Sequence, residues 1–257
     1  MSIDLSPAPG AAPLRRMIAS QAIIETRLLV RNAEQLVLAL VIPLLILVVG
    51  SDSSGIVDLG PGRPIDTLAP GVLALAVMST AFTSLAIATG FERRYGVLKR
   101  LGASPLPRLG LLAGKGGAVA VVQCVQLIVL GVAALLLGWH PGGGPAAFGW
   151  LLVLTVLGTA AFGSLALLIA GTLRAEATLA VANLVYVVLL VGGAVLVPLS
   201  RYPEAAQPLV RLLPSGALGE GLRDAFTGEG PGVVTVLVLL IWACVAGAAA
   251  SRTFRWE

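Results

Sequence analysis

The chain carries little charge for its length. Only 12% of its 257 residues are Asp, Glu, Lys or Arg, about half the charged fraction of a typical soluble domain. Seventeen basic and thirteen acidic side chains cannot cover the surface of a soluble protein of this size, and 57% of the residues are hydrophobic. We therefore expect lipid to solvate most of the surface. This excludes a soluble enzyme, a disordered tail and a nucleic-acid-binding protein with a basic soluble face.

Residues that build disulfide frameworks and metal centres are also scarce. The two cysteines, Cys124 and Cys244, lie far apart in apolar runs, and we expect them to be small buried residues without a disulfide. The single histidine, His140, excludes a histidine-based zinc site. No Gly-x-Ser-x-Gly motif is present. The sequence thus predicts no catalytic residue and no metal.

One short motif resembles a phosphate-binding loop but lacks its essential residues. Gly114-Lys115-Gly116 has Leu109 where the first glycine of the loop would stand, and Gly116 where Ser or Thr would follow the lysine. We expect Lys115 to lie at the cytoplasmic membrane interface with its ammonium directed toward headgroups. The chain is therefore expected to bind no nucleotide or other cofactor itself.

Long apolar runs dominate what remains. A helix needs about 20 apolar residues to cross the hydrocarbon core, and a Gly- and Pro-rich stretch at 138–145 divides the longest uncharged run into two. The predicted fold class is an all-α integral membrane protein, with one transmembrane permease domain over residues 1–257. Its six transmembrane helices are expected at residues 35–51, 67–91, 114–137, 146–172, 177–199 and 231–251.

Basic residues predict the orientation. Thirteen of the seventeen fall on the side that holds both termini, which places the termini in the cytoplasm. Residues 14–31 have an apolar stripe interrupted by Gln21 and Glu25, and charges interrupt the segment before a signal peptide could form. We predict an amphipathic helix in the cytoplasmic interface, with a solvated leader as the alternative.

The predicted spans have no ionisable side chain near their centres. This disfavours an ion channel and a proton- or ion-coupled carrier, because such proteins use a titratable group near the midplane. The polar groups within the spans are milder. They either line a substrate path or form hydrogen bonds between helices. The candidates for a substrate path are Thr80, Thr83, Gln123, Gln126 and Asn183.

The loop at 92–108 has the residues of a rigid elbow. The second predicted helix continues to Leu101, Gly102 suits its C-terminal cap, and Ser104 is placed to cap a new helix with Pro105 in its first turn. Such an elbow would project a charged knob into the cytoplasm, where a partner could push it. The alternative is an ordinary basic cytoplasmic loop.

The same loop carries a family resemblance. Its residues fit the pattern E-R-x-x-G-x-L-x-x-L-x-x-S/T-P-x-x-R, and Pro214 with Glu220-Gly221-Leu222-Arg223 is similar to P-x-x-x-x-x-E-x-L-R. Together with Pro43 inside the first span, these features resemble type 2 ATP-binding-cassette (ABC-2) exporter permeases, above all their daunorubicin-resistance-like multidrug branch. The matching loop residues are Glu92, Arg93, Gly96, Leu98, Lys99, Leu101, Ser104, Pro105 and Arg108.

The resemblance implies a transport subunit in the plasma membrane of a bacterium. It would move amphipathic drugs or lipids out of the cytoplasm or inner leaflet, and it would not hydrolyse ATP itself. Its partners would be two copies of a cytoplasmic ABC ATPase that carries ATP and Mg, a second permease copy or homologue, and membrane lipids, with no nucleic acid. Residues expected to couple the ATPase to transport are Glu92, Arg93, Tyr95, Gly96, Lys99, Ser104 and Pro105.

The outer side has one distinctive segment at 201–230. Three prolines cut it, and leucines recur between them at helical spacing. The resemblance implies short re-entrant helices, with Glu220 and Arg223 as a candidate outer gate; a simple surface hairpin is the alternative. The loop at 51–66 is short, so we expect no large extracellular domain.

Two other functions remain open. A membrane assembly or scaffold subunit would bind a cytoplasmic partner without moving a substrate. A membrane enzyme acting on lipids has less support, because no acid, base, metal or nucleophile constellation occurs in the predicted spans.

Overall fold

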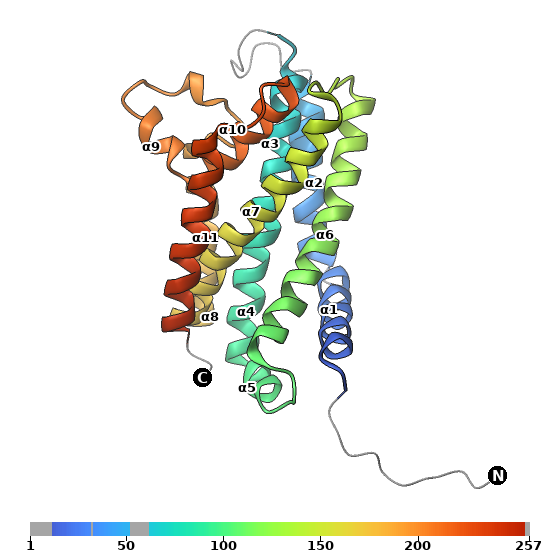
Figure 1. The fold of residues 1–257 in the computed structure, drawn as a ribbon, viewed down its shortest axis with the longest axis vertical. Helices are drawn as coiled ribbons and strands as arrows, with labels where there is room; N and C mark the ends of the chain where they lie inside the picture. The colour runs from blue at the N-terminus through green and yellow to red at the C-terminus, as the bar shows by residue number, and fades with distance from the viewer. Residues whose placement is uncertain (1–11, 32, 52–61, 255–257) are drawn as a thin grey trace, which may run out of the picture.

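The computed structural model describes residues 12–31, 33–51 and 62–254, and every regular element in these ranges is helical (Figure 1). The elements are α1 (Leu14–Arg31), α2 (Ala33–Ser51), α3 (Pro64–Met78), η1 (Ser79–Ser84), α4 (Leu85–Arg94), α5 (Val97–Gly102), α6 (Arg108–Leu136), α7 (Gly144–Thr172), α8 (Ala175–Gly192), η2 (Leu199–Arg201), α9 (Gln207–Arg211), α10 (Pro214–Thr227) and α11 (Val233–Thr253). The predicted all-helical character is thus confirmed for this part of the chain.

Among the described residues, five helices are long and apolar enough to cross a membrane. They are Pro64–Arg94, Leu109–Leu136, Gly144–Thr172, Ala175–Gly192 and Val233–Thr253. A further apolar stretch, Ala39–Ser51 in α2, is shorter. An integral membrane protein is therefore supported, and a sixth crossing stays a prediction. Most of the loop at 51–66 lies outside the described residues.

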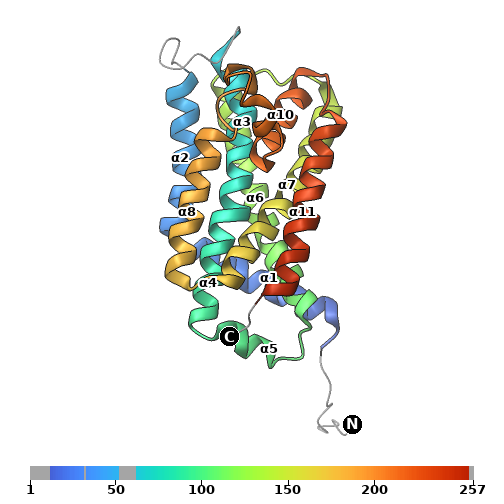
Figure 2. The same ribbon diagram turned by 90° about the vertical axis from the view of Figure 1, so that its left-hand side faces the viewer.

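The helices form an elongated bundle with two distinct ends (Figures 1 and 2). At one end lie α1, α5 and the last turn of α11, and we call this the α5 end. At the other lie α9, α10 and the start of α3, and we call this the α10 end. The two ends present different functional groups, so they are described separately below.

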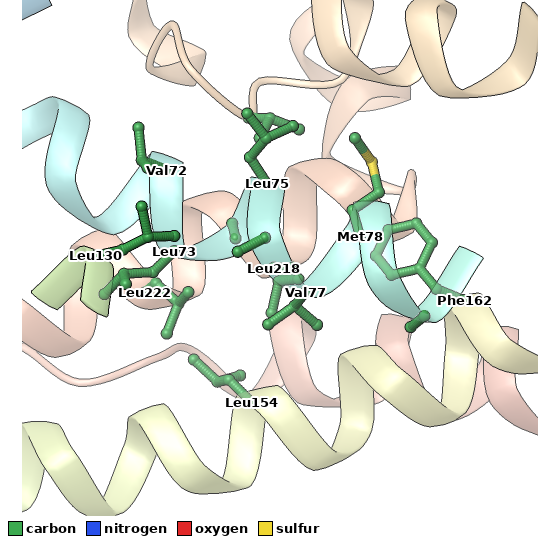
Figure 3. Packing of buried hydrophobic residues seen from close by; sticks show 14 of the residues in the cluster. Val72, Leu73, Leu75, Val77, Met78, Leu130, Leu154, Phe162, Leu218 and Leu222 are labelled. Atoms are coloured by element: carbon green, nitrogen blue, oxygen red, sulfur yellow. The ribbon is translucent and has the colours of Figure 1, made fainter. Parts of the chain in front are cut away.

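The centre of the bundle is the continuous helix formed by α3, η1 and α4. Its apolar residues surround the whole circumference of α3, from Leu68 to Met78, and such a helix is stable only when packed on all sides. Leu154 and Phe162 of α7 and Leu218 and Leu222 of α10 complete this core (Figure 3). Six residues of the central helix, the η1 segment, are π-helical.

Two of three sequence predictions about helix ends are wrong. The helix of the second span was expected to continue to Leu101 but stops at Arg94. Gly96 takes a left-handed conformation (φ 67°) that breaks the helix before α5. A helix does end at Gly102 as expected, although this helix is α5, the C-cap residue is Ala103 and Gly102 is not left-handed. Ser104 and Pro105 do not start a helix: α6 begins at Arg108, preceded by Pro107.

Two further predictions also differ. The fifth predicted span ended at 199, whereas α8 ends at Gly192 and the following segment is irregular, with Ala194 at a φ of 51°. Cys124 and Cys244 are exposed, not buried, because each lies on the outward face of its helix. In a membrane that face contacts lipid, which a cysteine tolerates as a small hydrophobic residue.

Candidate functional site

A buried ionic cluster lies near the α5 end. The ammonium of Lys115 on α6 lies 2.9 Å from a carboxylate oxygen of Glu25 on α1 and 2.6 Å from one of Glu92 on α4. Lys115 is 4% exposed, and Gln21 donates a hydrogen bond to Glu25 at 2.8 Å. The cluster joins three helices, and its two carboxylates outnumber the single ammonium.

Glycines on α6 allow α1 to approach this cluster. A Cβ atom on Gly114 would lie 2.6 Å from Cγ of Gln21, so a larger residue there would push α1 away. The face of α1 that packs is therefore the one with Gln21 and Glu25, while Ile24 and Leu28 are exposed. The expected position of Lys115 at the headgroups is wrong, because the two glutamates hold its ammonium inside the bundle.

The next two residues of α4 bind two other elements. Arg93 donates a hydrogen bond to the backbone carbonyl of Leu173, directly after α7. Arg94 forms an ion pair with Glu176 in the first turn of α8. Three consecutive residues, Glu92 to Arg94, thus tie the end of α4 to α6, to the end of α7 and to α8, and Lys115 extends this link to α1. We call Glu92, Arg93, Arg94 and these partners the α4 junction.

The other predicted coupling residues lie beyond the junction. Tyr95 is exposed and stacks on Phe91, with ring centroids 6.2 Å apart. Gly96 forms the break before α5, and Lys99 is exposed on α5. Ser104 donates a hydrogen bond to the Leu101 carbonyl at 2.6 Å, which closes the turn.

Pro105 is exposed in the same turn, between α5 and α6. The predicted coupling residues therefore form one continuous elbow at the α5 end (Figure 2). Their role in coupling stays a prediction. Sequence reasoning missed Glu25 and the pairing of Lys115, although two polar residues within an apolar stripe were the available signal.

Mid-bundle, two glutamines form a ladder of hydrogen bonds. Thr80 donates to the side-chain carbonyl of Gln126 at 2.6 Å, and Gln126 donates to the Ala39 carbonyl at 3.1 Å. Thr159 donates to Gln123 at 2.8 Å, and Gln123 donates to the Val77 carbonyl at 3.3 Å. The ladder joins α2, α3, η1, α6 and α7.

The remaining two candidates for a substrate path take no part in these hydrogen bonds. The hydroxyl of Thr83 is buried and has no hydrogen-bond partner among the described residues. Asn183 lies on the exposed face of α8. The structure therefore brings together Thr80, Gln123 and Gln126 but not Thr83 or Asn183, and whether any of them contacts a substrate stays a prediction.

At the α10 end, Arg223 connects several elements. Its guanidinium donates to the carbonyls of Ala194 at 2.9 Å, Val195 at 2.5 Å and Thr67 at 3.3 Å, and it pairs with Glu220 at 2.5 Å. Arg223 is 8% exposed. Arg223 therefore holds α10 against α3 and the segment after α8, and its side chain is buried between these elements.

A cavity of about 320 Å³ lies beside this arginine. Glu220, Asp224 and Arg211 are among the residues that line it. Burial, followed by the negative charges of Glu220 and Glu229, raises the pKa of Asp224 to about 6. A gating role for Glu220 and Arg223 stays a prediction.

The described residues include no group of three or more His, Cys, Asp or Glu side chains placed to hold a metal ion. The organised polar groups instead connect helices. The sequence model of the ABC-2 type transporter family matches residues 12–227, which cover the elbow, the α4 junction and α10. The chain belongs to the ABC-2 type transporter family.

Its similarity to individual relatives extends over nearly the full length. The probable doxorubicin resistance ABC transporter permease protein DrrC of Mycobacterium tuberculosis, from strains CDC 1551 / Oshkosh and ATCC 25618 / H37Rv, is 29% identical to this chain. Each alignment covers 93% of this chain and 89% of the relative. This chain is thus an ABC transporter permease subunit, and the ABC ATPase with which such permeases work is a separate chain.

Proposed function

We propose that this ABC-2 permease is the membrane subunit of an ATP-driven exporter that moves amphipathic drugs or lipids out of the cytoplasm or inner leaflet. The α5 end then faces the cytoplasm, both termini lie there, and α2 provides a sixth crossing. Two ATPase copies and a second permease, identical or homologous, complete the transporter. The drug-resistance name of the mycobacterial relatives supports this class of substrate.

The observation that carries the proposal is the α4 junction. A force on the elbow moves the end of α4. Glu92 binds that end to α6 and, through Lys115, to α1, while Arg93 and Arg94 bind it to the end of α7 and the start of α8. Displacement of α5 therefore acts on several spanning helices at once. An ordinary basic loop would need no such connections to the bundle.

The exposed ion pair of the α4 junction offers a clean test. Arg94 and Glu176 are 50% and 64% exposed, so reversing one charge changes stability little. We expect Arg94→Glu to reduce substrate-stimulated ATP hydrolysis by the purified permease–ATPase complex several-fold. The double change Arg94→Glu with Glu176→Arg should restore it, because the ion pair is rebuilt with opposite polarity.

A second exposed ion pair provides the matched control. Arg63 and Asp66 lie 3.1 Å apart at the α10 end, with similar exposure. Arg63→Glu should leave stimulation unchanged. If both reversals act alike, or if the double change fails to restore stimulation, transmission through the α4 junction is wrong. A complex that binds its ATPase yet shows neither stimulation nor transport in vesicles would favour the scaffold function instead.

A further inference from the structure

An apolar groove runs between α6 and α7 in the half of the bundle near the α5 end. The two helices diverge toward that end, and α4 lies between them (Figure 1). The groove has a volume of about 290 Å³, near the lower limit for ligand pockets. Its walls include Leu112 and Val119 of α6 and Val156 and Leu167 of α7, with Leu85 of α4 as the floor.

A glycine keeps this groove open. Gly114 and Gly117 face α1, where added Cβ atoms would meet Gln21 and Ala22. Gly116 is different: it lines the groove, and an added Cβ would meet nothing within 4 Å. Packing between helices therefore explains the first two glycines but not the third, whose missing side chain leaves space in the groove.

Besides Ser164, the side chains with polar atoms that border the groove are Lys115 and Thr159, and both have partners in the protein. The Lys115 ammonium binds Glu25 and Glu92, and the Thr159 hydroxyl donates to Gln123. Leu112 and Val156, 39% and 59% exposed, form part of an apolar rim. The groove thus suits a hydrocarbon chain better than a polar solute.

The position of the groove indicates which hydrocarbon chain fits. Leu112 to Val119 lie about 6–17 Å along α6 from its start at Arg108, at the depth of one leaflet. The α5 end carries exposed arginines that suit lipid phosphates. Those on the described residues include Arg15, Arg16, Arg100 and Arg174.

We infer that the α6–α7 groove seats one hydrocarbon chain of a phospholipid from the leaflet at the α5 end. The headgroup phosphate lies at the level of the exposed arginines, and the chain extends along Gly116 toward Val156. A bilayer supplies such chains at high local concentration. Water in the groove would find no hydrogen-bond partners on its apolar walls, so a hydrocarbon chain fills it better than water does. Binding of a lipid chain in this groove requires no transport activity, so the inference can be tested independently of the proposed function.

A photoreactive lipid tests the inference directly. The full-length chain is placed in nanodiscs with a phospholipid that carries a diazirine in the middle of one acyl chain, and labelled residues are mapped by mass spectrometry after illumination. We expect residues 112–119 and 156–167 to be labelled several-fold more than the exposed faces of α8 and α11. Equal labelling of all these faces would overturn the inference.

Filling the groove supplies the matched comparison. Gly116→Leu should lower labelling of the groove at least several-fold, because the added side chain occupies its space without a backbone clash. Gly131, on the same helix but outside the groove, also has open space around it, so Gly131→Leu should leave labelling unchanged. Unchanged labelling in Gly116→Leu would refute the site.

Two further measurements keep the result interpretable. Val156→Trp blocks the exposed rim and should reduce labelling even if Gly116→Leu does not fold, as judged by thermal melting. In a background with Cys124→Ser and Cys244→Ser, Val156→Cys should form no disulfide between two copies. Efficient disulfide formation would mean that a second permease covers the groove, and the lipid assignment would be wrong.

Discussion

At the scale of single residues, the informative positions are polar residues that interrupt apolar helix faces. In α1, Gln21 and Glu25 interrupt the predicted apolar stripe, and they are the side chains that the fold buries. Helical periodicity identified the irregularity but not its cause. Lys115 lies 90 residues from Glu25 and 23 from Glu92, and only the packing of α1 and α4 against α6 brings the three together.

Removing the central charge of this cluster should cost substantial stability. Lys115→Met leaves the Glu25 and Glu92 carboxylates buried without a cation, and breaking a buried pair costs about 3–5 kcal/mol. We expect a clearly lower melting temperature, measured on the purified protein in detergent. Adding Glu25→Gln and Glu92→Gln should recover much of the loss, because no unpaired charge then stays buried.

An exposed arginine on α1, the helix that carries Glu25, serves as the control for charge removal. Arg27 lies outside the buried face of α1, so Arg27→Met should change the melting temperature little. A Lys115→Met protein that melts with the wild type would show that the cluster contributes no net stability, and its role as a link between helices would lose its energetic basis.

At the scale of elements, composition and helix breakers predicted more than capping residues did. The Gly- and Pro-rich stretch at 138–145 was expected to separate two helices, and α6 ends at Leu136 while α7 begins at Gly144. The elbow was predicted at the right position and with a helix end at Gly102, but without the break at Gly96 and with the next helix starting too early. Glycine at 96 and glycine at 102 read alike in sequence, yet only Gly96 adopts the left-handed conformation.

These two glycines allow a matched test of the elbow. A residue with a side chain costs about 1–2 kcal/mol in the left-handed region, and no atom lies within 4 Å of a Cβ at either position. Gly96→Ala should therefore strain the break between α4 and α5 without a clash. We expect weaker substrate stimulation of the partner ATPase with normal membrane insertion.

Gly102→Ala provides the comparison, since Gly102 is helical and alanine favours helices over glycine. It should leave stimulation unchanged and stability equal or slightly higher. Stimulation that is equal in both variants and the wild type would mean that the shape of the elbow at Gly96 does not matter for coupling.

At the scale of the whole molecule, the sequence predicted the class of architecture from its low charge and the family from the elbow pattern. It could not predict how the polar groups pair, because hydrogen bonds such as Gln126 to the Ala39 carbonyl depend on how helices distant in sequence pack. The sequence also leaves open whether the chain crosses the membrane an odd or an even number of times. In the part of the chain that the structure describes, five helices meet the length of a full span, and α2 contributes the shorter apolar stretch Ala39–Ser51.

The parity can be measured with reporters at the two ends. Six crossings put both termini on one side, whereas five put them on opposite sides. We expect a fluorescent protein that folds only in the cytoplasm to fluoresce when fused to either terminus, and a periplasm-dependent phosphatase to be active when inserted at Glu204, between η2 and α9. Thirteen of the seventeen basic residues fall on the side that is predicted to be cytoplasmic, which favours this result. Fluorescence at only one terminus would mean that α2 does not cross. The elbow and the C-terminus would still share a side, because the four helices α6, α7, α8 and α11 lie between them.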